Sequence, residues 1–300
     1  MGVRETESVR LLPVRVVWLA LPLTAGSAVM DVLDGWREAP RTVAAALLWL
    51  AWGAGLVALL APRPAGVTAI RVIAPTFAVL GIVVAATSDT SALAATGAVV
   101  GTLAAALLVA DPAVALAAAN AVAYGDERRH PLRVPTALYL APVPVARAVV
   151  AAGIASGPLL LADERWLAGT VALVIGLPLA WLAARSLETL VRRWPVLVPA
   201  GIAIVDEMTL ADPVLFVRRT LRGVRERPGT APVADDVADL RLGATLGTVE
   251  LEVDGTVDVV RAARGARPNE TLHTTVILLA VAGRRELLGT AAARPRTATR

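Results

Sequence analysis

Residues 192–198 have the sequence Arg-Arg-Trp-Pro-Val-Leu-Val, and the character of the chain changes at the pair Arg192-Arg193. Before this pair, long apolar runs are separated by short charged loops. After it, no apolar run reaches the roughly 20 residues that a helix needs to cross a bilayer. The change predicts an α-helical transmembrane bundle over residues 1–190 and a small β-rich domain over residues 191–293. Residues 294–300 are predicted to form a disordered tail.

The composition supports a membrane location for the first part. Of the 300 residues, 56% are hydrophobic and only 18% are charged, whereas a soluble domain has about 25% charged residues. The mean hydropathy is +0.66. We therefore expect the lipid bilayer to cover the excess apolar surface and to be the main partner of this chain.

Several classes of functional site are excluded by residue counts. The chain has no cysteine, which excludes disulfides, thiolate zinc sites and cysteine nucleophiles. Its two histidines, His130 and His273, lie far apart, and no HExxH motif is present. The net charge of +4 comes from arginine alone, with no nucleic-acid-binding motif. We expect no cofactor, no metal, no nucleic-acid partner and no enzymatic activity.

The first part contains about six stretches that are long and apolar enough, or nearly so, to span a membrane. They are residues 16–33, 43–61, 70–87, 92–110, 137–161 and 166–184. After the fourth stretch, Asp111-Pro112 precedes a run of small residues over 113–124, too short to cross alone. Asp111 is expected to cap this run, which either extends the fourth helix or re-enters the membrane. Five or seven crossings therefore also remain open.

The arginines favour an even number of crossings. With six helices and an inner N-terminus, eleven arginines lie in cytoplasmic segments and three in outer loops, with Arg147 inside the fifth span. Because cytoplasmic loops of membrane proteins carry an excess of basic residues, this bias predicts that both termini lie in the cytoplasm.

Residues 191–293 have the patterns of a small antiparallel β domain. Val249, Leu251 and Val253 alternate with acidic residues, which is typical of a half-buried strand. Asp254-Gly255 follows and predicts a tight hairpin turn before a second alternating run. Further strands are expected over residues 194–198, 202–205, 214–217 and 272–281. Residues 284–293 are expected to form a short closing helix.

Two segments resemble uncharacterised actinobacterial multipass membrane proteins with a C-terminal β domain. One is the segment 192–216, which begins Arg192-Arg193-Trp194 and contains Asp206 and Asp212-Pro213. The other is Tyr124-Gly125-Asp126-Glu127-Arg128-Arg129-His130-Pro131-Leu132-Arg133. The strand number and closing helix are similar to those of PH-like domains. The resemblance covers about residues 120–290 and implies a cytoplasmic PH-like domain, but it assigns no activity or catalytic residue.

Asp31 and Arg147 are charged residues within predicted spans. Counted from the inner end of each helix, they lie about 22 and 20 Å deep at 1.5 Å per residue, so we expect them to be able to pair. An intramembrane charge is a candidate for function, here a substrate or ion site. The alternatives are a structural ion pair or, if the fifth helix begins later, an arginine that reaches the membrane surface.

The loop residues Asp126, Glu127, Arg128 and Arg129 form a concentrated charge cluster. Its arginines can act as a topology signal beside anionic headgroups, which is the interpretation we favour. It can also form a cytoplasmic ion-pair network or dock the β domain.

These patterns predict a membrane scaffold or partner-binding protein more strongly than an enzyme. The β domain is well marked, while no catalytic constellation accompanies it. The expected partner is a cytoplasmic protein that binds the β domain. The alternative is a transporter or small channel that uses the Asp31–Arg147 pair.

Overall fold

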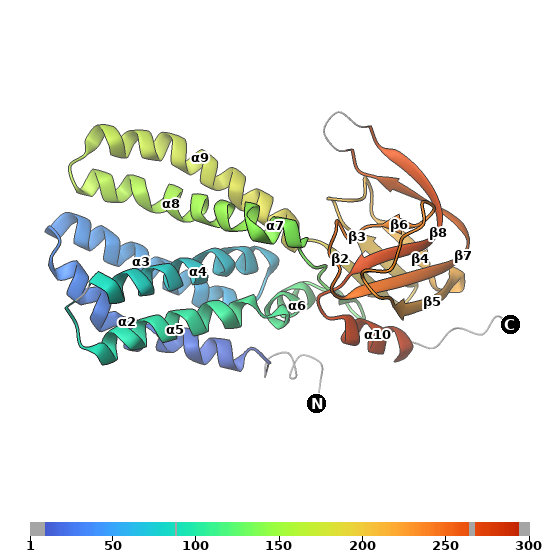
Figure 1. Cartoon of the computed structure of the whole chain (residues 1–300), viewed down its shortest axis with the longest axis horizontal. Coiled ribbons are helices and arrows are strands. Elements are labelled where there is room, and N and C mark those ends of the chain that lie inside the picture. Colours follow the sequence, from blue (N-terminus) through green and yellow to red (C-terminus); the bar gives the residue numbers. More distant parts are fainter. Residues whose placement is uncertain (1–9, 88, 264–267, 294–300) are drawn as a thin grey trace. The chain divides into compact units, whose positions relative to one another are not determined.

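The computed structural model describes residues 10–87, 89–263 and 268–293 of the chain. They form two compact units (Figure 1). The helical unit contains the described residues up to Ala118 together with Val143–Glu188. The β unit contains Ala119–Pro142 and the described residues from Thr189 onward. The predicted tail at 294–300 lies outside the described residues.

Six helices among the described residues are long and apolar enough to cross a membrane, as the sequence predicts. The chain is therefore a multi-pass membrane protein. The six helices are α2 (Leu12–Asp34), α3 (Glu38–Leu60), α4 (Pro64–Thr87), α5 (Ala92–Ala110), α8 (Pro142–Ala162) and α9 (Trp166–Val191).

Two tryptophans join α2 to α3. The indole N–H of Trp18 donates to the backbone carbonyl of Trp52, and the indole of Trp52 donates to the carbonyl of Trp18, both at 2.9 Å. The Trp18 ring also stacks on Phe77 of α4, with ring centroids 5.8 Å apart. The full burial of Trp18 depends on Gly55 of α3, because a Cβ at that position would overlap the indole ring.

Glycines allow two other helix pairs to approach closely. A Cβ on Gly97 or Gly101 of α5 would meet Thr24 of α2 at 2.9 and 2.6 Å. Gly153 of α8 lies against the backbone of Gly176 of α9. Small residues let transmembrane helices pack backbone to backbone, which explains how closely these two helix pairs approach.

The short helix α6 (Pro112–Ala121) follows α5 as a separate element. A carboxylate oxygen of Asp111 accepts a hydrogen bond from the backbone N–H of Ala113 at 2.7 Å, which confirms the predicted cap. A second short helix, α7 (Thr136–Leu140), precedes α8.

The β unit consists of two four-stranded sheets and the closing helix α10 (Arg284–Ala293). One sheet has the order β1-β2-β3-β4 and the other has the order β5-β7-β8-β6. All strand pairs are antiparallel except β6 with β8. The strands are β1 (Arg128–Arg129), β2 (Trp194–Val198), β3 (Gly201–Val205), β4 (Val214–Val217), β5 (Leu221–Glu226), β6 (Ala238–Asp239), β7 (Thr248–Arg261) and β8 (Glu270–Ala280).

The predicted hairpin at Asp254-Gly255 is wrong. These residues lie inside the single long strand β7, and both halves of β7 pair with β8. The register shifts between Glu252 and Val257, and Gly255 has a φ of +77°. The backbone around Gly255 therefore forms a bulge and not a turn. The chain does not reverse here, because β8 is long enough to pair with the alternating runs on both sides of Gly255.

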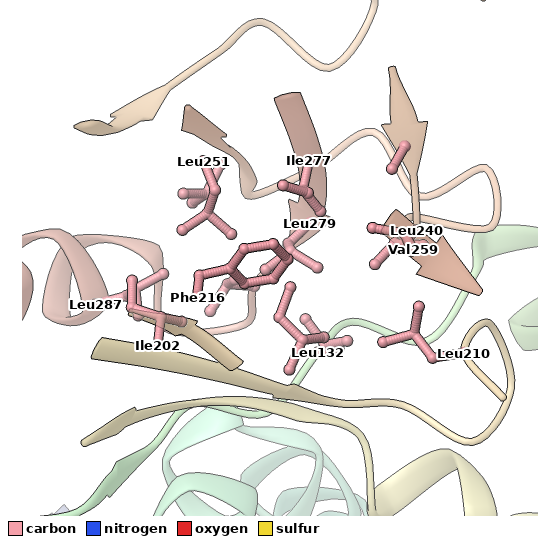
Figure 2. Packing of buried hydrophobic residues seen from close by; sticks show 14 of the residues in the cluster. Leu132, Ile202, Leu210, Phe216, Leu240, Leu251, Val259, Ile277, Leu279 and Leu287 are labelled. Carbon is pink, nitrogen blue, oxygen red and sulfur yellow. The ribbon is translucent and has the colours of Figure 1, made fainter. Parts of the chain in front are cut away.

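The two sheets pack face to face over one apolar core. Figure 2 shows Ile202 and Phe216 of the first sheet opposite Leu251 and Leu279 of the second, and Leu287 of α10 beside them. All five residues are at most 4% exposed. The β unit thus has a hydrophobic core of its own, as a compact domain requires.

The segment between α6 and α7 belongs to the β unit. Arg128 and Arg129 pair as β1 with Leu197 and Val196 of β2. Leu132 then bridges to Val281 at the end of β8. The β unit therefore consists of two separate pieces of chain and begins well before residue 191.

Candidate functional site

The structure does not bring Asp31 and Arg147 together. Asp31 is an exposed residue three positions before the end of α2, where its carboxylate accepts a hydrogen bond from the backbone N–H of Asp89 at 2.9 Å. Arg147 is five residues after the start of α8.

Ion pairs in the loops place these two positions at different levels of the helical unit. Arg37, just after α2, pairs with Asp163 and Glu164, just after α8. The end of α2 is therefore beside the end of α8, whereas Arg147 lies 16 residues before Asp163. That separation is about 24 Å along the helix. The expectation of a shared depth fails because α2 begins at Leu12 and α8 at Pro142, so the first helix starts earlier and the fifth later than the apolar runs suggest.

The charge cluster at 126–129 is part of the β unit instead of an open loop. The side-chain amide of Asn120 bonds both the N–H and the carbonyl of Arg129, at 3.0 and 3.1 Å. The Arg129 guanidinium bonds Glu127 at 3.2 Å and lies 5.4 Å from the centroid of the Trp194 ring. Of the interpretations open from the sequence, these contacts match docking onto the β domain, and the Arg129–Glu127 ion pair also matches an ion-pair network within the cluster. Asp126 lies in the turn before this strand.

Arg193 forms an ion pair in the interior of the β unit. Its Nε and Nη2 donate to the two carboxylate oxygens of Asp206 at 2.7 and 2.8 Å, and the two side chains are at most 1% exposed. Asp206 also accepts from the Thr209 hydroxyl and the backbone N–H of Met208. This network fixes the start of β2 to the turn after β3.

A ladder of arginine–carboxylate pairs covers β5 and β7. Arg225 and Arg227 both bond Glu250, at 2.6 and 2.7 Å, and Arg222 bonds Asp254. Burial raises the pKa of Glu250, but the hydrogen bonds from Arg227 and Arg225, together with their positive charges, outweigh this effect. The pKa of Glu250 therefore lies below its usual value of 4.5. Glu250 is thus held ionised although it is only 5% exposed.

The β unit should lose stability in acid because of Glu250. A carboxylate whose pKa is lower in the folded state than in the unfolded state stabilises the fold. This stabilisation is complete at a pH above the pKa of the unfolded state, and it is lost as the pH falls through the pKa of the folded state. The midpoint of thermal unfolding should therefore decrease below about pH 4.5. Glu250→Gln should lower the midpoint at pH 7 and weaken the acid dependence. Glu270→Gln, an exposed control, should leave both unchanged, and an equal acid dependence in all three proteins would contradict the assignment.

The strand β5 leaves backbone groups open at the edge of its sheet. Among the described residues it pairs with β7 alone, and the Arg227 N–H bonds the carbonyl of Thr248 at 3.4 Å. Hydrogen-bonded and non-hydrogen-bonded pairs alternate along an antiparallel ladder. Because Arg227 bonds β7, every second residue before it also faces β7, and the residues between them, Val224 and Glu226, point their N–H and C=O groups away from β7. No backbone hydrogen bond joins these groups to another strand or helix within the described residues.

A groove of about 610 Å³ runs beside this open edge. Its walls come from β5, from the β2–β3 end of the other sheet and from α10. Leu197, Ile202 and Leu288 make it partly apolar, and Arg218, Arg225 and Glu226 add charges of both signs. Its volume is within the range of ligand-binding pockets. This groove is the candidate site, which the sequence does not reveal because β5 carries no clear alternating pattern.

The described residues contain no group of three or more His, Asp or Glu side chains that could hold a metal. Comparison with protein-family models, with curated proteins and with solved structures finds no match to this chain. The functional interpretation therefore rests on the geometry of the two units.

Proposed function

We propose that this chain is a non-enzymatic scaffold of the bacterial plasma membrane whose β unit binds a protein partner in the cytoplasm. The observation that carries the proposal is the open edge of β5 beside the groove. An extended peptide can add to such an edge through main-chain hydrogen bonds, while pockets beside it select its side chains. The arginine bias of the loops supports the cytoplasmic side for the β unit and for both termini.

The groove favours an extended protein segment over a flat lipid surface. Its apolar wall residues, Leu197, Ile202 and Leu288, lie in a recess, whereas headgroup binding relies on exposed basic clusters. The nearby arginines Arg222, Arg225 and Arg227 are already engaged with Asp254 and Glu250. The two sheets and the closing helix α10 also support the interpretation of this unit as PH-like.

Photo-crosslinking in living cells tests the proposal on the full-length chain. Gly223 lines the groove. An added Cβ there meets nothing within 4 Å, so the position has space for the side chain of a photoreactive phenylalanine. Gly289 is the matched control, since it is equally open but lies on α10 outside the groove. We expect a protein adduct of discrete mass from position 223 and none from 289. Adducts to lipid alone, or equal adducts at both positions, would overturn the proposal.

A proline variant tests the binding mode. Glu226→Pro removes an N–H that points away from β7, so it spares the β5–β7 ladder but removes a donor for an added strand. Glu226→Ala keeps the N–H and removes the same ion pair with Arg284. We expect the proline variant to lose the crosslink at position 223 and the alanine variant to keep it. Retention in both variants would exclude strand addition at this edge.

A further inference from the structure

The open edge of β5 carries a row of arginines. Arg222 and Arg225 bond Asp254 and Glu250 of β7, yet the two arginine side chains remain 61% and 64% exposed. Resting on the proposed addition of a partner strand to β5, we infer that the partner segment is acidic. It places carboxylates beside these arginines and apolar side chains toward the groove.

The pairing register puts Arg225 on the face of the sheet that points away from the core. Val249 and Leu251 belong to the core of the β unit, so Glu250 between them points to the opposite face. Arg225 lies directly opposite Glu250 and shares that outer face, whereas its neighbour Val224 packs against the core. An added strand alternates in the same way. Its residue beside Arg225 therefore lies on the outer face, and the two flanking residues point inward.

The charges on the outer face alternate from strand to strand. The β5 side of the β5–β7 pair presents Arg222 and Arg225, and the β7 side presents Glu250, Glu252 and Asp254. For a strand added to β5, the acidic row is one strand spacing of about 4.8 Å further away than the arginines. Opposite charges on neighbouring strands stabilise a sheet, and like charges destabilise it. A carboxylate beside Arg225 is therefore favoured, and a lysine or arginine there is disfavoured.

Arg225 can serve carboxylates on both of its sides. Its Nε and Nη2 bond Glu250 at 2.8 and 2.6 Å. A guanidinium has five N–H donors in a planar fork, so one carboxylate does not use them all. Glu226, which also lines the groove, is paired with Arg284 at 2.7 Å, and this pair neutralises its charge locally.

The inward side chains of an added strand meet apolar walls. These walls are formed by Leu197 and Ile202 of the first sheet and by Leu288, Ala291 and Ala292 of α10. Apolar side chains gain free energy when they leave water for such a recess. A charged side chain would lose its hydration there. The partner segment therefore alternates apolar and acidic residues.

Two fluorescent peptides test this inference on the full-length chain, purified in a mild detergent. One probe is Gly-Ser-Val-Glu-Val-Glu-Val-Ser-Gly, and the other has lysine in place of each glutamate. Fluorescence anisotropy at low ionic strength measures their binding, because salt screens charges at the surface. We expect the acidic probe to bind about tenfold more tightly than the basic probe. Equal affinities, tighter binding of the basic probe or no binding of either would overturn the inference.

Two variants with the same change of charge assign the preference to the groove. Arg225→Gln removes the charge beside the added strand and leaves Glu250 bonded to Arg227. Arg285→Gln is the matched control, because Arg285 is exposed on α10 and does not line the groove. We expect the ratio of the two affinities to fall about threefold in Arg225→Gln and to stay unchanged in Arg285→Gln. The same ratio in both variants would contradict a role for Arg225.

Failure of this inference and failure of the proposed function give different results. A protein adduct from position 223 combined with equal affinities for the two probes leaves strand addition standing and overturns the acidic partner alone. The absence of an adduct, together with no binding of either probe, overturns both.

Discussion

Replacing Arg193 by alanine should destabilise the β unit by about 3–5 kcal/mol, because it leaves the Asp206 carboxylate buried without its partner. Both oxygens of Asp206 bond Arg193, and the Asp206 side chain has no exposed surface. A loss of this size is a large fraction of the roughly 5–15 kcal/mol by which a typical domain is stable. Arg193→Lys should recover only part of it, since an ammonium group cannot make the two parallel hydrogen bonds of a guanidinium.

Hydrogen exchange of the β7 and β8 amides in the full-length protein measures this effect, because core strands open only with the whole unit. The neighbouring residue provides the control. Arg192 is exposed, so Arg192→Ala should change the free energy of opening by less than about 0.5 kcal/mol. Equal exchange in the two alanine variants would show that the ion pair does not hold the β unit together.

Replacing Trp18 by alanine should destabilise the helical unit by about 3–5 kcal/mol, the usual loss for a buried tryptophan. The substitution removes the stacking on Phe77, opens a cavity beside Gly55 and breaks the hydrogen bond to Trp52. Trp18→Phe keeps an aromatic ring but removes the indole N–H, so it should cost less than the alanine variant.

The midpoint of unfolding in increasing concentrations of SDS, measured on the purified chain, reports this loss. Trp166→Ala is the control, because that tryptophan is 66% exposed and its side chain faces outward. We expect a large shift for Trp18→Ala and almost none for Trp166→Ala. A similar shift for both would mean that the Trp18–Trp52 contact does not organise these helices.

The features predicted well from the sequence are those with a strong local physical cause. Six apolar helices follow from length and hydropathy, and the cap of α6 follows from Asp111 before a proline. The strands β2 and β4 were bounded correctly because their apolar runs are short and flanked by prolines or charges.

The errors concern contacts between distant parts of the chain. Asp254-Gly255 has the local chemistry of a turn, but pairing with β8 decides that it is a bulge. The sequence leaves open whether Arg128 and Arg129 dock onto the β domain, and it gives no sign that Arg193 is buried; the pairing of β1 with β2 and the ion pair with Asp206 show both. A basic residue in a loop and one in a core look the same in a single sequence.

The candidate groove was missed for the same reason. β5 has the sequence Leu-Arg-Gly-Val-Arg-Glu, which alternates poorly because of the irregular register between Leu221 and Gly223. Only the pairing of β5 with β7 shows which of its backbone groups remain open. Arg147 and Asp31 failed as a pair because their depth depends on where α8 and α2 begin, and apolar runs locate helix ends poorly.

Cysteine labelling of intact cells tests most directly whether the β unit is a cytoplasmic extension of a membrane bundle. The chain has no cysteine, so Arg165→Cys and Ala234→Cys each introduce a single thiol, one before α9 and one within the β unit. An impermeant maleimide should label position 165 in intact cells and position 234 only after the membrane is opened. Labelling of position 234 in intact cells, or of both positions under the same condition, would contradict a membrane-crossing α9 and a cytoplasmic β unit.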